Sequence, residues 1–178
     1  MTKAEIRKNI LAIRKNIEDR DKKDFLIADC LMSQKFYKEA KTIMVYVSYN
    51  SEVDTHKLIE KMLADGKKLC APKCISKEVI EARAFERISD LTSGAYGILE
   101  PDGEQTDDID LVIVPGVAFN DELHRIGYGA GYYDRFLEGF SGVCCGLFYE
   151  IQKNDFKNDA GDKQLDYIIT EKSVYERK

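Results

Sequence analysis

Hydrophobic residues near the start of the chain recur every three or four positions, the spacing of an amphipathic helix. They are Ile6, Ile10, Ile13 and Ile17. Thr2 and Glu5 can form a capping box, because each side chain can bond a backbone amide that the first turn leaves free. The pattern predicts a helix that ends near residue 20. A second helix is predicted over residues 22–37, with Phe25 on its inner face.

Short apolar runs rich in β-branched residues follow, and runs of this length are typical of buried strands. The clearest is Asp-Leu-Val-Ile-Val at residues 110–114. Strands are predicted over residues 43–48, 67–71, 79–85, 110–114, 143–148 and 166–170. A helix capped by Asp54 or Thr55 and ended by Gly66 separates the first two, and another begins near Gly131. Alternating strands and helices predict an α/β fold, a Rossmann-like three-layer α/β/α sandwich around a mostly parallel sheet.

Length and charge narrow the possible functions. The 178 residues contain no repeat or linker, which predicts a single domain over residues 1–178. The 27 Lys and Arg against 32 Asp and Glu give a net charge of −5, which argues against nucleic-acid or anionic-membrane partners. The run of residues 100–110 holds six acids and no base, and we expect it to be a solvated loop.

Targeting and cysteine patterns predict a cytoplasmic protein. No apolar run approaches the roughly 18–20 residues that span a bilayer. Charges interrupt the first ten residues, which is unlike a signal peptide. The five cysteines are odd in number and follow no export signal, so we expect free thiols in a reducing compartment.

Seven of the 12 glycines fall within residues 116–146. Gly127, Gly129 and Gly131 let the backbone approach a ligand and turn its amides toward an anion, and a helix that opens at Gly131 adds positive charge. Arg125 flanks these glycines, and Asp134 can hold a metal ion against bound phosphates. Three glycines alone are as compatible with a tight turn of purely structural role as with an anion-binding loop. The string is neither a Walker loop nor a dinucleotide fingerprint.

The longer string VPGVAFNDELHRIGYGAGYYDRFL, residues 114–137, resembles the signature of the 5-formyltetrahydrofolate cyclo-ligase family, also called 5,10-methenyltetrahydrofolate synthetase. The resemblance extends to Lys3 and Arg7 and to residues 48–55, 96–101 and 165–171. It implies a three-layer α/β sandwich. It also implies cyclisation of 5-formyltetrahydrofolate to 5,10-methenyltetrahydrofolate, dependent on ATP and Mg²⁺, with ADP and phosphate released through a phosphorylated formyl (iminium phosphate) intermediate.

The resemblance also implies a role for each matching residue. The ATP contacts expected from it are Lys3, Arg7, Arg125, Gly127, Tyr128, Gly129, Ala130, Gly131, Tyr132 and Tyr133. The expected catalytic residues are Arg125 and Tyr132, and the expected substrate contacts are Val47, Glu52 and Tyr132. The expected metal ligands are Asp134 and Asp162, with Asp166 as the alternative to Asp162.

Competing hypotheses remain at this point. One is a non-catalytic relative that binds nucleotide or folate without turnover. Another, an isomerase or transferase on a similar sandwich, rests on fold alone. The expected partners are the small molecules ATP and 5-formyltetrahydrofolate, with no nucleic acid and no membrane, and the chain is expected to be a monomer or a small homo-oligomer.

Overall fold

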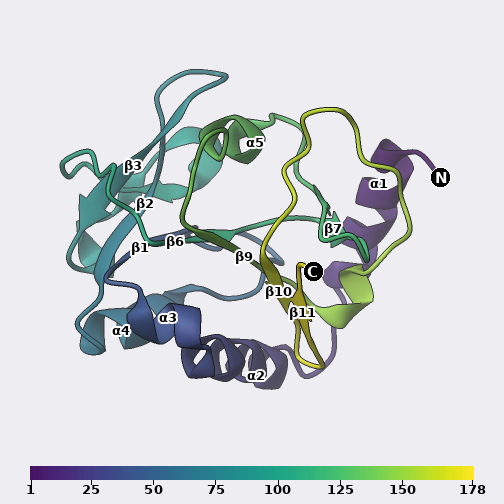
Figure 1. The fold of residues 1–178 in the computed structure, drawn as a ribbon, viewed down its shortest axis with the longest axis horizontal. Coiled ribbons are helices and arrows are strands. Elements are labelled where there is room, and N and C mark those ends of the chain that lie inside the picture. Colours follow the sequence, from purple (N-terminus) through teal and green to yellow (C-terminus); the bar gives the residue numbers. More distant parts are fainter.

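A seven-stranded sheet forms the centre of the computed structural model, which describes residues 1–178 (Figure 1). The strand order is β11-β10-β9-β6-β1-β2-β3. The strands are β1 (Thr42–Val45), β2 (Lys68–Cys74), β3 (Ile80–Phe85), β6 (Leu111–Val114), β9 (Val143–Leu147), β10 (Tyr167–Ile169) and β11 (Val174–Glu176). The five central strands are parallel, and only the edge strands β3 and β11 pair antiparallel. The predicted mostly parallel sheet is confirmed, with β11 as an unpredicted addition.

Helices cover both faces of the sheet, as the three-layer prediction requires. They are α1 (Lys3–Arg14), α2 (Arg20–Ser33), α3 (Lys35–Glu39), α4 (His56–Ala64) and α5 (Tyr132–Phe136). Helices α2, α3 and α4 lie on one face, and α5 lies on the other (Figure 1). Strand β6 contributes Leu111 and Ile113 to the first core and Val112 and Val114 to the second. Burial on both faces explains its continuous apolar sequence.

Short elements complete the chain. They are the strand pairs β4 (Thr92–Ser93) with β5 (Leu99–Glu100) and β7 (Ala118–Phe119) with β8 (Arg125–Ile126), and the 3₁₀ turns Ile88–Asp90, Ala95–Gly97 and Glu150–Gln152. Helix α1 packs on the β7–β8 hairpin through a small apolar cluster that includes Ile6, Ile10, Ala118 and Ile126. This cluster fixes α1 beside the segment that follows β8.

Two predicted helix boundaries are wrong. Helix α1 ends at Arg14 instead of near residue 20, and Ile13 is 44% exposed. The chain turns before α2 through Asp19, whose φ of 51° is left-handed. The helix predicted over residues 22–37 is two helices, because Gln34 is extended with ψ at 144°. Phe25, expected to face inward, is 56% exposed.

The acidic segment lies along one edge of the sheet. Its backbone bonds that of β3, with Ala84 N donating to Glu104 O and Thr106 N to Ala82 O, both at 2.8 Å. It thereby covers an edge that would otherwise present unpaired backbone groups. Five of its six acids are exposed, as expected of a solvated loop, whereas Glu100 is only 8% exposed.

The sheet topology indicates where a ligand binds. From β1 the chain proceeds to β2 on one side, whereas from β6 it proceeds to β9 and β10 on the other. Open parallel sheets bind ligands at the carboxyl ends of the strands, where the strand order reverses. Here that position is the end of β1 and β6. No helix of the structure is long and apolar enough to cross a membrane.

Candidate active site

The glycine loop, residues 127–131, connects β8 to α5. Gly129 has a φ of 110° and Gly131 a φ of 68°, conformations that side chains with a Cβ rarely adopt. Helix α5 has only five residues, so its dipole contributes less positive charge than the sequence suggested. The cations for a phosphate chain must therefore come from side chains.

Arg7 supplies one of these cations. Its Nε donates a 2.8 Å hydrogen bond to Gly127 O, and its Nη2 lies 4.0 Å from the position that a Cβ on Gly129 would occupy. The predicted capping box is confirmed, with Thr2 N donating to Glu5 Oε2 at 2.7 Å and Glu5 N to Thr2 Oγ1 at 3.3 Å. It fixes the first turn of α1 and hence places Arg7 over the glycine loop.

Lys3 lies one turn before Arg7 and contacts the C-terminal part of the chain. Its Nζ pairs with Asp159 at 2.8 Å and also with Asp162. Burial raises the pKa of Asp162, but the hydrogen bonds from Lys3 and from Asp159 N, with the charge of Lys3, together outweigh this, and the pKa lies below its ordinary value. Helix α1 is thereby tied to residues 159–162.

Arg125 lies beneath the glycine loop, with its side chain only 3% exposed. Its Nη1 pairs with Asp134 Oδ1 at 2.8 Å, and the same oxygen accepts a 3.1 Å bond from Lys163 N. Arg125 Nε and the hydroxyl of Tyr133 are buried without hydrogen-bond partners. Most buried polar groups in folded proteins have a hydrogen-bond partner. The unpartnered Arg125 Nε and Tyr133 hydroxyl make this position a candidate for contact with a polar group of a ligand.

The two expected metal ligands come from neighbouring segments. Asp134 accepts the amide of Lys163, the residue that follows Asp162. Asp134 Oδ2 and Asp162 Oδ1 form no hydrogen bond within the chain. No group of three or more His, Cys, Asp or Glu side chains gathers anywhere in the chain. Two carboxylates suit Mg²⁺, which keeps several water or phosphate ligands, better than they suit a metal that needs a full protein cage.

Asp166, the alternative ligand, lies elsewhere. Its carboxylate accepts Cys144 N at 2.8 Å and pairs with Arg177 at 2.6 Å. These contacts are at the start of β9 and β10, at the opposite end of the strands from the glycine loop. The structure therefore favours Asp162 over Asp166.

Glu52 belongs to the loop after β1, residues 48–52, which we call the 48–52 loop. Its Oε1 accepts a 2.7 Å bond from the hydroxyl of Tyr128, and its Oε2 accepts a 2.8 Å bond from Tyr49 N. Burial raises the pKa of Glu52, although these two bonds and the charge of Arg14 oppose the shift. The expected substrate residue Glu52 and the expected ATP residue Tyr128 are thus in direct contact.

Two arginines that the sequence analysis did not single out hold this region together. Arg14 is 2% exposed and bonds Ser51 Oγ at 3.0 Å, Gly116 O at 3.0 Å and Tyr128 Oη at 2.7 Å. Arg20 donates to Ser51 O at 2.9 Å. A signal for Arg14 was present, because it continues the apolar stripe of Ile6 and Ile10 at the same spacing of four. An arginine on the buried face of a helix is expected to have hydrogen-bond or charge partners inside the protein.

Tyr132 and Val47 lie apart from this cluster. The hydroxyl of Tyr132 donates to Ser76 O at 3.1 Å in the turn between β2 and β3, and its ring lies under the guanidinium of Arg135. The side chain of Val47 is buried in the core beneath α2 and α4. Only the backbone of Val47 is therefore positioned to contact a ligand at the strand ends.

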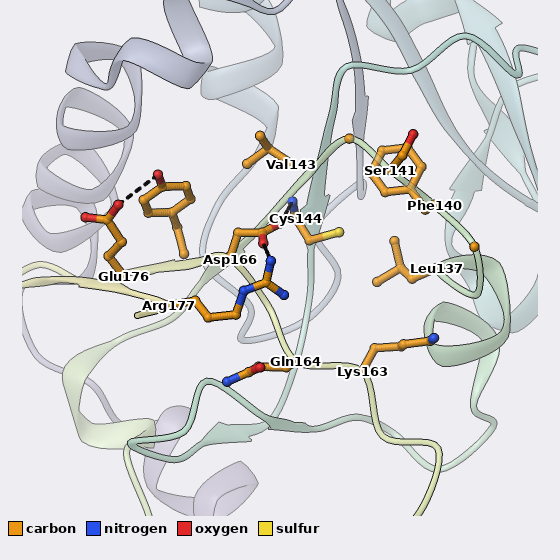
Figure 2. Close-up of a pocket in the computed structure, with 13 residues that line it drawn as sticks. Leu137, Phe140, Ser141, Val143, Cys144, Lys163, Gln164, Asp166, Glu176 and Arg177 are labelled. Carbon is orange, nitrogen blue, oxygen red and sulfur yellow. Dashed lines mark hydrogen bonds and ion pairs between the residues drawn. The ribbon is translucent and has the colours of Figure 1, made fainter.

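A separate cavity lies at the other end of the sheet from the glycine loop. Its volume is about 630 Å³, and it lies between the end of α5 and the first residues of β9 and β10. Figure 2 shows Asp166 and Arg177 facing each other beside Cys144, with Lys163 extending toward α5. Since ligands bind at the carboxyl ends of parallel strands, this cavity is not the candidate site. None of the expected catalytic or ATP residues lines it.

Comparison with known proteins shows which family this arrangement belongs to. The model of the 5-formyltetrahydrofolate cyclo-ligase family matches residues 1–171. The chain belongs to the cyclo-ligase family. A probable 5-formyltetrahydrofolate cyclo-ligase from Schizosaccharomyces pombe is 33% identical over 162 residues, 78% of each chain. Membership confirms the resemblance of the glycine-rich string and makes the chain an enzyme of the ligase class.

Solved structures of cyclo-ligase relatives share the fold. The NMR structure of 5,10-methenyltetrahydrofolate synthetase from Aquifex aeolicus aligns with a TM-score of 0.87 at 35% identity, covering 99% of this chain and 93% of that one. The enzyme of the same name from Mycoplasma pneumoniae aligns with a TM-score of 0.80 at 28% identity, covering 96% and 99%. The predicted α/β architecture is therefore that of the cyclo-ligase family.

Proposed function

We propose that the protein cyclises 5-formyltetrahydrofolate to 5,10-methenyltetrahydrofolate, using ATP and Mg²⁺ and releasing ADP and phosphate. One observation carries the proposal beyond family membership. The glycine loop lies under Arg7 and is hydrogen-bonded through Tyr128 to the partly buried carboxylate of Glu52. A nucleotide held by the glycine loop would therefore adjoin a substrate held by the 48–52 loop.

The chemistry explains the need for ATP. Ring closure must expel the formyl oxygen, which is a poor leaving group. Transfer of the γ-phosphoryl group to that oxygen gives an iminium phosphate, and attack by the second nitrogen then releases phosphate. The protein's main contribution to such a transfer is in-line positioning and stabilisation of charge.

The basic residues divide this task. Lys3 and Arg7 lie one turn apart on α1, on one helical face, so that both reach the same phosphate chain. Arg125 lies beneath the loop and has an unpartnered Nε. We assign it charge stabilisation during transfer. Gly129 and Gly131, with Tyr128, Ala130 and the other loop residues, present the backbone to the phosphates.

Asp134 and Asp162 would hold Mg²⁺, each through an oxygen that has no partner within the chain. Bound there, the ion would neutralise negative charge on the phosphate oxygens. In the structure each carboxylate faces a cation instead, Arg125 for Asp134 and Lys3 for Asp162. Phosphate groups that attract these cations would release the carboxylates for the metal.

Glu52 is assigned to the folate, and Tyr132 and Tyr133 to the formyl group or a ring. Tyr133 has an unpartnered hydroxyl, and burial raises its pKa, so it is a neutral hydrogen-bond donor. Five free cysteines, of which Cys70, Cys144 and Cys145 are buried, fit a reducing compartment such as the cytoplasm.

The decisive experiment mixes the protein with MgATP and 5-formyltetrahydrofolate and follows the absorbance of the methenyl product. We expect product only when ATP and Mg²⁺ are both present. Nucleotide binding without product would support the non-catalytic alternative. Arg7→Met should lower kcat/KM, whereas Lys8→Met removes a charge from an exposed position one residue along and is the matched control. Equal losses in both variants would contradict the assignment of Arg7.

A further inference from the structure

The hydroxyl of Tyr128 occupies an unusual position between two loops. It accepts a 2.7 Å bond from Arg14 Nη2 and donates a 2.7 Å bond to Glu52 Oε1. No other hydrogen bond joins the glycine loop to the 48–52 loop. The ring of Tyr128 is 50% exposed, so core packing alone does not explain its place.

Arg14 anchors this contact in the core. It is the last residue of α1, and its three nitrogens bond three separate segments: Ser51 of the 48–52 loop, Gly116 after β6, and Tyr128 of the glycine loop. It forms no direct ion pair with any carboxylate. Its buried charge acts on the carboxylate of Glu52, which is linked to it through the hydroxyl of Tyr128. Buried charges require such partners.

We infer that the chain Arg14–Tyr128–Glu52 couples the two substrates: binding of nucleotide at the glycine loop tightens binding of the folate at the 48–52 loop, and the reverse. Arg14 and Tyr128 are positioning residues in this scheme. The inference rests on the proposed function, because it assigns nucleotide to one loop and folate to the other. It adds a thermodynamic link that family membership does not supply.

The physical reason for the coupling is that one ligand orders groups that the other ligand would otherwise have to order. A ligand that fixes the glycine loop fixes Tyr128, and Tyr128, together with the amide of Tyr49, holds the carboxylate of Glu52 in one orientation. The second ligand then meets a loop that is already arranged and loses less conformational entropy on binding. Such coupling is reciprocal, so each ligand lowers the dissociation constant of the other by the same factor.

Calorimetric titration measures this factor directly. The dissociation constant of a non-hydrolysable ATP analogue, in the presence of Mg²⁺, is determined with and without saturating 5-formyltetrahydrofolate. We expect the ratio of the two constants to be about ten in the wild-type protein and to fall below about two in Tyr128→Phe. The ratio separates positioning from general damage, since a merely structural defect would weaken analogue binding equally under both conditions.

Tyr46→Phe is the matched control. Its hydroxyl, also near the end of β1, donates to Val53 O at 3.1 Å and forms no hydrogen bond with the glycine loop. This variant should keep the wild-type ratio. Glu52→Gln should lower the ratio as Tyr128→Phe does, and the double variant should lower it no further, because both changes break the same link.

The possible outcomes distinguish a failure of the coupling from a failure of the proposed function. A wild-type ratio near one, with both ligands bound, overturns the coupling and leaves the proposed function intact. A Tyr128→Phe protein that binds both ligands with the wild-type ratio also overturns it. Failure of the wild-type protein to bind the folate refutes the proposed function and the coupling together.

Discussion

Substitution of Gly129 by alanine tests whether the backbone of the glycine loop binds the nucleotide. Its φ of 110° lies far from conformations that alanine favours, and a Cβ there would meet only the end of the Arg7 side chain, at 4.0 Å. The penalty is therefore backbone strain without a steric clash, about 1–3 kcal/mol. If the free loop relaxes, the strain returns when nucleotide binds, and the dissociation constant rises by about 5- to 150-fold.

The assay combines calorimetric titration of an ATP analogue with thermal unfolding. Gly66→Ala is the control, since Gly66 has a φ of 75° and open space around it but follows α4, away from the site. It should lose about 1–2 kcal/mol of stability and no nucleotide affinity. The reasoning is refuted if Gly129→Ala matches the wild-type protein in both measurements, or if Gly66→Ala loses as much affinity.

Three further predictions concern the charged groups. Burial raises the pKa of Asp162, but the hydrogen bonds from Lys3 and Asp159 N and the charge of Lys3 together place it below its ordinary value. The resulting stability is present above about pH 4 and is lost as pH falls through the folded-state pKa. Lys3→Met should reduce this acid-side loss in denaturant titrations, and an unchanged pH profile would exclude the ion pair. Asp134→Asn leaves the buried Arg125 without a carboxylate, so it should lower the free energy of unfolding by about 2 kcal/mol. It should also raise the Mg²⁺ concentration needed for half-maximal activity at least about ten-fold. A Mg²⁺ titration identical to that of the wild-type protein would contradict the assignment of Asp134 as a metal ligand. Burial raises the pKa of Glu52, so the free energy of unfolding falls as pH rises from about 4.3 through the folded-state pKa. Glu52→Gln should abolish this fall and weaken folate binding. Wild-type folate affinity in this variant would contradict the assignment of Glu52 to the folate.

The sheet was predictable because its strands carry their signal locally. Residues 111–114 are apolar on both faces, and the structure buries β6 completely. Strand β11 carries no such signal, since Val174–Glu176 alternates weakly and only pairing with β10 makes it a strand. The prediction of one helix over residues 22–37 was wrong at Gln34 for a related reason. Helical periodicity continues through that position, and tertiary packing decides where α2 ends.

The site was predictable as far as its motif extends. The glycine loop and Arg125 are adjacent in sequence, and Arg7 lies on the predicted first helix, so their grouping required only the resemblance. The partners of the charged residues could be identified only from the folded structure. Lys3 and Asp162 are 159 residues apart in sequence, and nothing local indicates that they pair. Arg14 was missed although its place on the apolar stripe of α1 indicated burial.

The fate of the formyl oxygen tests the central claim most directly. The proposed function requires this oxygen to accept the phosphoryl group and leave with it. The measurement uses 5-formyltetrahydrofolate labelled with a heavy oxygen isotope in the formyl group, incubated with the protein and MgATP. Mass spectrometry of the released phosphate should find one heavy oxygen in each phosphate formed alongside the methenyl product. Release of unlabelled phosphate, or of product without phosphate, would contradict the account.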